Sequence, residues 1–168
     1  MVAPARLDPG EDKLRPLSLH KLDEVTAALL NRLLTVTIDG LGTSAYVYCE
    51  VPILWVIDQA GDLWFSIEEI VSAEISGEFL QPRVRHSAVV DGTHRLGHPS
   101  LIAGQSGRIG GEIIYDPAFP DPAWYISNGS GRYGLVKGRK PEHLTNAKRL
   151  FSAFGINFRE DFQPTDPP

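Results

Sequence analysis

The sequence has little of what usually identifies a protein at once, and each absence excludes something. It contains one cysteine, Cys49, in 168 residues, so neither an internal disulfide nor a cysteine-based zinc site is expected. No run of about 18 apolar residues occurs, which argues against a membrane-spanning helix. Residues 1–6 lack the apolar core of a signal peptide. We therefore expect a soluble cytoplasmic protein, which would reach another cell only through a secretion system that needs no cleavable signal.

The charge balance is mildly acidic. Sixteen Lys and Arg face 21 Asp and Glu, which gives a net charge of -5 at pH 7 with neutral histidines. Such a surface argues against broad binding to the phosphate backbones of DNA or RNA and favours a small-molecule or protein partner. Basic residues nevertheless gather in residues 83–85 and 132–140, so a local basic patch is allowed. The sequence gives no indication of the oligomeric state.

Two helices are predicted, one towards each end of the chain. Ser18 is a good N-cap for the first, which should end near Leu34. Pro141 suits the first turn of the second, and Gly155 would stop it. The expected apolar faces consist of Leu19, Leu22, Val25, Leu29, Leu30 and Leu33 in the first helix, and of Leu144, Ala147, Phe151 and Phe154 in the second.

The middle of the chain predicts β-structure. Residues 53–58 and 62–67 suit a hairpin, whereas residues 67–75 suit a short helix, although their Ile and Val also suit a strand. Residues 91–111 predict a long loop, which in a compact domain is often functional. Further strands are expected at residues 46–50, 83–90, 112–115 and 124–127.

Together these elements predict an α+β fold, a twisted, mostly antiparallel sheet flanked by an N-terminal and a C-terminal helix. The single domain would span residues 17–162, with a flexible arm at residues 1–16 and a flexible tail at residues 163–168.

The first glycine-rich segment, residues 98–112, is one of two candidate functional segments. Its glycines, Gly104 among them, would let backbone N–H groups approach a phosphate or carboxylate, and Arg108 adds charge. The segment matches neither a P-loop nor a dinucleotide fingerprint, and the alternative is a tight turn and bulge entering a strand. Burial of Glu112 would suit it to acid–base chemistry, whereas outward placement would make it an ordinary strand carboxylate. A metal site built on His86, His94 and His98 with Glu112 is not expected, because Gly97 and Pro99 disfavour a helix that would place His94 and His98 on one face.

The second glycine-rich segment, residues 128–133, supplies an amide, a hydroxyl, a guanidinium and a phenol within six residues. Arg132 suits a clamp on an anion, and Tyr133 suits stacking on a ring, with Asn128 and Ser130 as further ligand-binding residues. The alternative is a strand-ending turn in which Tyr133 packs on the core.

Short motifs in the second half of the chain occur in a familiar order. They are His98-Pro-Ser through Gly111-Glu-Ile, then Ser130-Gly-Arg-Tyr, then a helix that opens at Pro141. This order, over about residues 86–160, resembles a domain at the ends of bacterial polymorphic-toxin and effector proteins and in plant calmodulin-binding IQ-motif proteins. Their pattern is roughly His-Ser-Ser, Ala-Gly-Glu and Ser-Gly-His-Tyr before a closing helix. Here Pro99 stands in place of the first Ser, and Arg132 stands in place of the His.

The leading hypothesis is an effector-like or toxin-like domain that binds a nucleotide-sized anionic ligand between the two glycine-rich segments. If it is an enzyme, ADP-ribosyl transfer from NAD is the first reaction to test, with Glu112 as the carboxylate and with His98 and Ser100 orienting the ligand. The competing hypothesis is a non-catalytic interaction module, such as an immunity or adaptor protein. The residues expected to bind the ligand are Gly104, Arg108, Asn128, Ser130, Arg132 and Tyr133.

Overall fold

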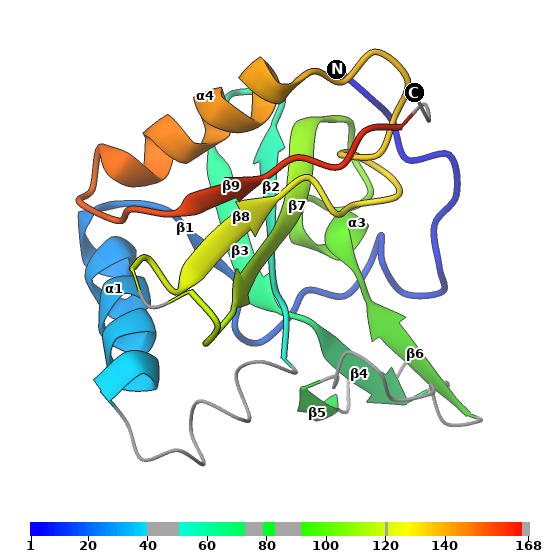
Figure 1. The fold of residues 1–168 in the computed structure, drawn as a ribbon. Helices are drawn as coiled ribbons and strands as arrows, with labels where there is room; N and C mark the ends of the chain where they lie inside the picture. The colour runs from blue at the N-terminus through cyan, green and yellow to red at the C-terminus, as the bar shows by residue number, and fades with distance from the viewer. Residues whose placement is uncertain (40–50, 73–78, 83–91, 120, 166–168) are drawn as a thin grey trace.

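The computed structural model describes residues 1–39, 51–72, 79–82, 92–119 and 121–165 (Figure 1). Helices in this part of the chain are α1 (Glu24–Asp39), α3 (His98–Leu101) and α4 (Pro141–Ser152). Strands are β1 (His20–Lys21), β2 (Ile53–Asp58), β3 (Leu63–Ile67), β4 (Glu69–Ser72), β5 (Phe79–Pro82), β6 (Thr93–Leu96), β7 (Gly107–Tyr115), β8 (Trp124–Ser127) and β9 (Arg159–Asp161).

The strands form two sheets, and the predicted α+β class is confirmed. The larger sheet has the order β1-β3-β2-β7-β8-β9, and the smaller has the order β5-β4-β6. Neighbouring strands are antiparallel except for β8 and β9, which run parallel. Among the described residues, no helix combines the length and the apolar character that a bilayer crossing requires.

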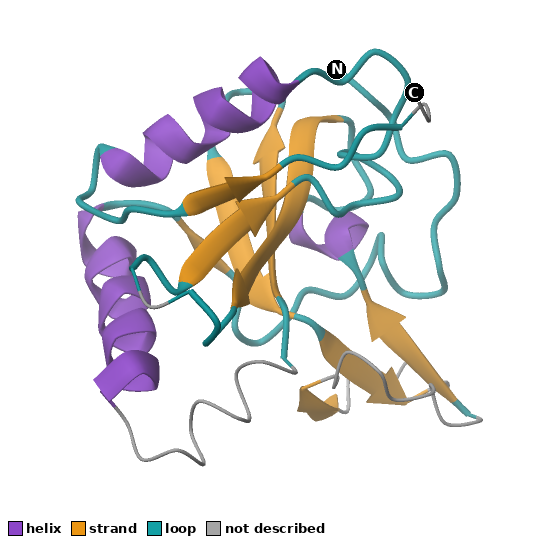
Figure 2. Ribbon diagram, viewed as in Figure 1, coloured by secondary structure: helices purple, strands orange, loops and turns teal. Residues whose placement is uncertain are grey.

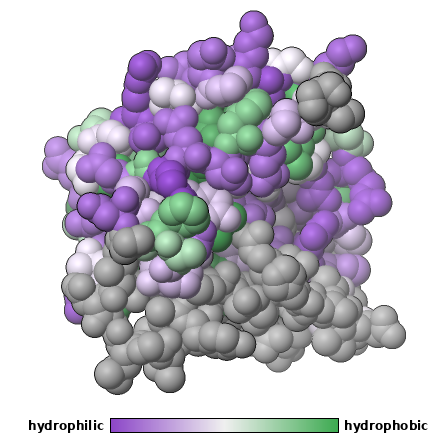
Figure 3. All heavy atoms as spheres, viewed as in Figure 1, coloured by the Kyte–Doolittle hydropathy of each residue, from purple (hydrophilic) through white to green (hydrophobic). Residues whose placement is uncertain are grey.

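Helices α1 and α4 cover one face of the larger sheet, and α3 lies against the other (Figure 2). The alternation of side chains along β2 separates the two cores, because successive residues of a strand point to opposite faces. Trp55 packs in the core under α1 and α4, whereas Leu54 and Val56 pack with Leu101 of α3 and with Tyr133. In the view of Figure 3 most of the described surface is hydrophilic, and apolar side chains form small separate patches.

Helix α1 begins later than predicted, and its buried side differs from the predicted stripe. Asp23 is the cap: its carboxylate accepts a hydrogen bond from the Thr26 N–H at 2.8 Å, and the Thr26 hydroxyl oxygen accepts one from the Asp23 N–H at 2.9 Å. The predicted cap, Ser18, instead donates its hydroxyl to the Glu69 carboxylate at 2.6 Å. The stripe is also corrected, because Val25 and Leu29 are exposed. The buried residues of this region are Leu22, Ala27, Leu30 and Leu34.

The second predicted helix is confirmed as α4. Leu144, Ala147 and Phe151 are buried beneath it, whereas Phe154 lies beyond its end and is 39% exposed. Gly155 follows with a φ of 77°, a left-handed conformation that glycine adopts at little cost at the end of a helix.

Of three local predictions in the middle of the chain, one is confirmed, one was left open between two structures, and one is wrong. The hairpin is present as β2 and β3, with Ile57 opposite Leu63. Residues 67–75 were expected to suit a short helix or a strand, and Glu69–Ser72 forms strand β4, which lies between β5 and β6 and has mostly buried side chains. The loop predicted at residues 91–111 instead contains β6, α3 and the start of β7. The strands predicted at residues 46–50 and 83–90 lie outside the described residues.

The N-terminal arm, expected to be loose, is packed on the rest of the chain. Val2 pairs with Gly107 through two backbone hydrogen bonds of 2.8 and 2.9 Å, and the Glu11 side chain is fully buried. The start of the predicted tail is also held, since the Gln163 N–H donates to the Asn128 side-chain oxygen at 2.7 Å. Residues 1–16 therefore belong to the structured body and contribute to the site described next.

Candidate functional site

The two glycine-rich segments meet at one pocket of about 420 Å³, which we call the Gly97 pocket. Five parts of the chain surround it: the arm, the junction of β3 and β4, the turn from β6 into α3, strand β7, and the loop after β8. Its ionisable lining residues are Arg6, Glu68, Arg95, His98, Glu112 and Arg132. The structure thus brings His98, Glu112 and Arg132 together.

Glycines allow these parts to approach one another closely. A Cβ atom on Gly97 would lie 2.8 Å from a carboxylate oxygen of Glu11 and 3.3 Å from a guanidinium nitrogen of Arg132. A Cβ atom on Gly111 would lie 1.8 Å from the backbone carbonyl oxygen of Ser127, which is far inside van der Waals contact. These two glycines therefore serve contacts within the chain, and neither position tolerates a side chain unless its neighbours move.

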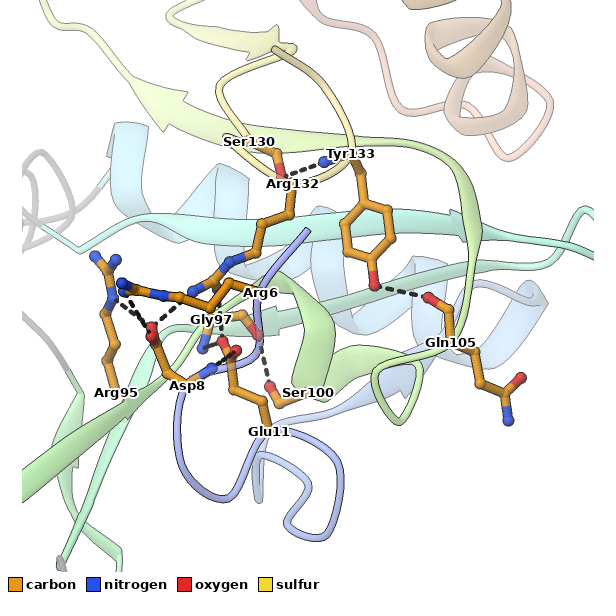
Figure 4. A network of polar contacts seen from close by, with 10 residues as sticks. All are labelled: Arg6, Asp8, Glu11, Arg95, Gly97, Ser100, Gln105, Ser130, Arg132 and Tyr133. Carbon is orange, nitrogen blue, oxygen red and sulfur yellow. Dashed lines mark hydrogen bonds and ion pairs between the residues drawn. The ribbon is translucent and has the colours of Figure 1, made fainter. Parts of the chain in front are cut away.

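A network of charged side chains forms one wall of the pocket (Figure 4). The Asp8 carboxylate forms ion pairs with Arg132 at 2.7 Å, with Arg6 at 3.0 Å and, more distantly, with Arg95 at 3.6 Å. Arg132 also donates to the buried Glu11 carboxylate at 2.8 Å. Three guanidinium groups are therefore shared between two carboxylates, both of which come from the arm.

The same network shifts the pKa values of its members. Burial alone would raise the pKa of Asp8, but hydrogen bonds and charge from Arg132 and Arg6 hold it below its ordinary value. Burial raises the pKa of Glu11, although the backbone N–H of Asp8 and the charge of Arg132 oppose that shift. Burial would lower the pKa of Arg132, but Asp8 and Glu11 raise it instead, so Arg132 stays charged.

His98 opens helix α3 and is held in a defined orientation. Its Nε2 lies 2.9 Å from the backbone carbonyl oxygen of Gly111. Because a carbonyl oxygen only accepts, Nε2 must carry a proton and donate it. Burial lowers the pKa of the imidazole despite the hydrogen bond to Gly111 and the nearby charge of Glu112, so the ring is neutral at pH 7. Its Nδ1 then holds a lone pair and can take up a proton.

The two carboxylates of the lining come from the sheets. Glu112 lies on β7, and a Cβ atom on Gly129 would be 3.7 Å from one of its oxygens. Glu68 lies between β3 and β4, and one of its oxygens would be 3.9 Å from a Cβ atom on Gly97. Both carboxylates thus face the same small space as His98.

Two predicted site residues are buried away from the pocket, which corrects their expected roles. Ser100 is fully buried, and its hydroxyl donates to the carbonyl of Gly97 at 2.7 Å, within the turn that opens α3. Tyr133 is fully buried in the core beneath α3, and its hydroxyl donates to the carbonyl of Gln105 at 2.8 Å. Ser100 therefore does not orient a ligand, and Tyr133 offers no face on which a ligand ring could stack.

Three further predicted ligand residues also lie outside the Gly97 pocket, whereas Ser130 lines it. Gly104 has a φ of 67° and packs against Leu7 of the arm. Arg108 is exposed and donates to a backbone carbonyl of the β2–β3 turn. Asn128 is buried and exchanges two hydrogen bonds with the backbone of residue 163, so its role is to hold the C-terminal segment.

Sequence reasoning missed the arm. Asp8 and Glu11 stand three residues apart around Gly10, whose φ of 88° closes a turn that directs both carboxylates towards Arg132. The local signal was present in the Asp-Pro-Gly-Glu motif, a common turn sequence, but the partner arginine is more than a hundred residues away. Among the described residues, no group of three or more His, Cys, Asp or Glu side chains is arranged to hold a metal ion.

Comparisons of the chain with protein-family models, with curated proteins and with solved structures found no match in any of the three.

Proposed function

We propose that the chain is an effector-like domain whose Gly97 pocket binds a small ligand of nucleotide size that carries an anionic group. The observation that carries this proposal is the convergence of Arg6, Arg95 and Arg132, from three distant segments, on one wall of a pocket. Guanidinium groups are the side chains best suited to bind phosphate and carboxylate oxygens. Asp8 already occupies such a position, which indicates that the geometry suits an oxyanion.

The size and the charge of the pocket agree with this proposal. Small-molecule sites commonly enclose roughly 300–1,000 Å³, and this pocket encloses about 420 Å³. On the arginine wall, three cations face two anions, so Asp8 and Glu11 do not fully neutralise the guanidinium groups there. Glu68 and Glu112 supply negative charge elsewhere in the lining, which favours a ligand whose anionic group is joined to an electron-poor or cationic part.

NAD has this combination of a pyrophosphate and a cationic nicotinamide ring, so ADP-ribosyl transfer is the reaction we propose to test. The bond between nicotinamide and ribose would break, and nicotinamide would leave with the bonding electrons. Glu112 would stabilise the cationic ribose centre that develops. A nucleophile of the acceptor would then bond to the ribose carbon, and its proton would pass to Nδ1 of His98.

Calorimetric titration with NAD and ADP-ribose tests the binding step, with Arg95→Gln as the variant and Arg32→Gln as its control. Both changes remove one positive charge, from a half-buried side chain at Arg95 and from an exposed one at Arg32, but Arg32 lies on α1, outside the pocket. Loss of one charge-assisted contact should weaken binding about tenfold in Arg95→Gln and leave Arg32→Gln unchanged. Absence of heat with the unaltered protein, or equal weakening in both variants, would refute the proposal.

The reaction step is tested separately through nicotinamide release. Glu112→Gln should keep NAD binding and abolish release, since it removes the charge and preserves the shape. If the unaltered protein binds NAD but releases no nicotinamide, the domain binds a ligand without catalysing the reaction, and the enzyme hypothesis is refuted.

One observation favours the second candidate, a non-catalytic interaction module. Val25, Leu29 and Val36 of α1 are 72%, 52% and 51% exposed and form an apolar surface that a partner protein would cover. In that case Leu29→Glu should abolish partner binding, whereas Arg95→Gln should not affect it. Retained partner binding in Leu29→Glu would remove this candidate.

A further inference from the structure

A second pocket of about 330 Å³ lies between β7 and helix α4, and we call it the Arg139 pocket. It is lined from the β2–β3 turn, from β7, from the loop before α4 and from α4 itself. It shares no lining residue with the Gly97 pocket. The two pockets are therefore separate candidate sites.

The floor of the Arg139 pocket is apolar. Ile57 and Ile109 stand opposite each other on paired antiparallel strands, and both line the pocket. Ala147 and Leu150 complete the lining from α4, and Leu150 is 38% exposed. A ligand that fills this pocket would gain free energy by covering these apolar atoms.

Two guanidinium groups stand at the rim, and backbone carbonyls hold both of them. Arg108 donates from Nε and Nη2 to the carbonyl of Gln59, at 3.2 and 2.9 Å. Arg139 donates from the same two atoms to the carbonyl of Tyr133, at 3.1 and 2.7 Å, and also contacts the carbonyl of Arg108. Carbonyls fix the orientation of a guanidinium but do not neutralise it. Within the described part of the chain, neither arginine forms an ion pair with a carboxylate.

The remaining polar groups of the rim are also hydrogen-bond donors. Nδ1 of His143 accepts from the backbone N–H of Lys140 at 3.1 Å, so the neutral ring carries its proton on Nε2. The side-chain oxygen of Asn146 accepts from Arg149 at 3.0 Å, which leaves its NH₂ group for a ligand. Among the described residues, no carboxylate lines the pocket.

The pocket has an apolar floor, a rim of hydrogen-bond donors, and two positive charges that no described carboxylate neutralises. These features define the complementary ligand. It has an apolar body the size of a ring and one group that only accepts hydrogen bonds and carries about two negative charges. A phosphate monoester meets this description, since it has three acceptor oxygens and a charge of roughly -1.5 to -2 at pH 7. We propose that the Arg139 pocket is a binding site for a small phosphate monoester with an aromatic or other apolar body.

Phenyl phosphate is the probe, with inorganic phosphate as the ligand that lacks the apolar body. Titration of the full chain by calorimetry should show phenyl phosphate binding at least about tenfold more tightly than inorganic phosphate, because only the ester covers the apolar floor. Equal affinities would mean that the arginines attract anions without a built pocket, and would overturn the proposal.

The matched variants are Arg108→Gln and Lys137→Gln. Each removes one positive charge from an exposed residue of the same region, but only Arg108 lines the pocket. Arg108→Gln should weaken phenyl phosphate binding about tenfold, and Lys137→Gln by less than about twofold. Equal weakening in the two variants would show general charge attraction and overturn the proposal.

A third variant tests the donor character of the rim. Asn146→Asp replaces a donor with a charged acceptor at an exposed position, so it should weaken phenyl phosphate binding by at least about tenfold. Thermal unfolding of each variant, compared with the unaltered chain, verifies that the fold is retained. Undiminished binding in Asn146→Asp would place the ligand elsewhere and overturn the proposal.

Discussion

Replacing Arg132 with methionine should destabilise the protein severely, because it strands a buried carboxylate. Glu11 is fully buried and accepts three hydrogen bonds: from Arg132 at 2.8 Å, from the Asp8 N–H at 2.7 Å and from the Gly97 N–H at 3.1 Å. Arg132→Met removes the charged donor and leaves the two backbone donors. Asp8 retains Arg6 and Arg95, so most of the cost falls on Glu11.

The expected cost is large relative to the stability of a domain. Breaking a buried ion pair by removing one partner typically costs about 3–5 kcal/mol. Since a domain of this kind is stable by about 5–15 kcal/mol in total, the variant should unfold at markedly lower urea concentration. Arg6→Met is the control: it removes an arginine of the same network whose side chain is 78% exposed, and it should cost less than about 1 kcal/mol.

A double-mutant cycle isolates the pair. Glu11→Gln removes the buried charge, so Arg132→Met should cost much less in that background, with a coupling free energy of about 1–3 kcal/mol. Urea unfolding followed by tryptophan fluorescence measures all four proteins. A cost below about 1 kcal/mol for Arg132→Met, or additive effects of the two changes, would refute the assignment of Glu11 as a buried charge that depends on Arg132.

The dependence on pH gives a second test of the same reasoning. Burial raises the pKa of Glu11 above 4.5, so the native state binds the proton more tightly than the unfolded chain does. This contribution favours the native state at low pH, and it is lost as pH rises through the raised pKa. Without Arg132 the pKa of Glu11 rises further. The difference in unfolding free energy between Arg132→Met and the unaltered protein should therefore narrow as pH falls from about 7 to 5. A gap that stays constant or widens would contradict this.

Two further predictions compare residues that differ mainly in their surroundings. Gly111→Ala should destabilise by more than about 4 kcal/mol, because its Cβ atom would lie 1.8 Å from the Ser127 carbonyl oxygen. Gly131→Ala should change stability by less than about 1 kcal/mol, because no atom of the described residues would lie within 4 Å of its Cβ atom. Urea unfolding of the two variants measures both costs, and similar costs would contradict the close approach at Gly111. Phe151→Ala should cost about 3–5 kcal/mol of stability, because Phe151 is fully buried. Phe154→Ala changes a side chain that is 39% exposed, so it should cost less than about 1 kcal/mol. Equal shifts in melting temperature for the two variants would show that α4 packs on a different face.

The elements that could be predicted from the sequence are those whose signals are local. The β2–β3 hairpin follows from a Gly-containing turn between two apolar runs, and α4 follows from Pro141, Gly155 and an apolar repeat between them. In each case the residues that specify the element lie within it or at its ends.

The elements that were predicted wrongly or left open depend on distant partners. Helix α1 has more apolar residues than one face can bury, and the sheet beneath it buries Ala27 and Leu34 while leaving Val25 and Leu29 exposed. Strand β4 was ambiguous, because its Ile and Val suit either structure. Its pairing with β5 and β6, which only the fold supplies, decides the outcome.

In the candidate site, too, the predictions that rest on local sequence succeed and those that depend on distant partners fail. Glycine-rich composition indicated the two segments that meet, and His98, Glu112 and Arg132 lie together in the pocket. Composition did not reveal which polar side chains form hydrogen bonds with the backbone. Ser100 and Asn128 were therefore expected to bind a ligand, although Ser100 holds a turn and Asn128 holds the C-terminal segment. The same composition marks functional loops and ordinary turns.

The ion pairs of Arg132 with Asp8 and Glu11 join residues that are 124 and 121 positions apart. Closing so long a loop carries a high conformational entropy cost, so this contact should form late in folding. The arm shows little apolar burial, with Leu7 39% exposed, so it should also be among the first parts to detach in the native protein. Hydrogen exchange at the Gly97 amide, which the Glu11 carboxylate protects, should therefore be faster than exchange at the amides of β2.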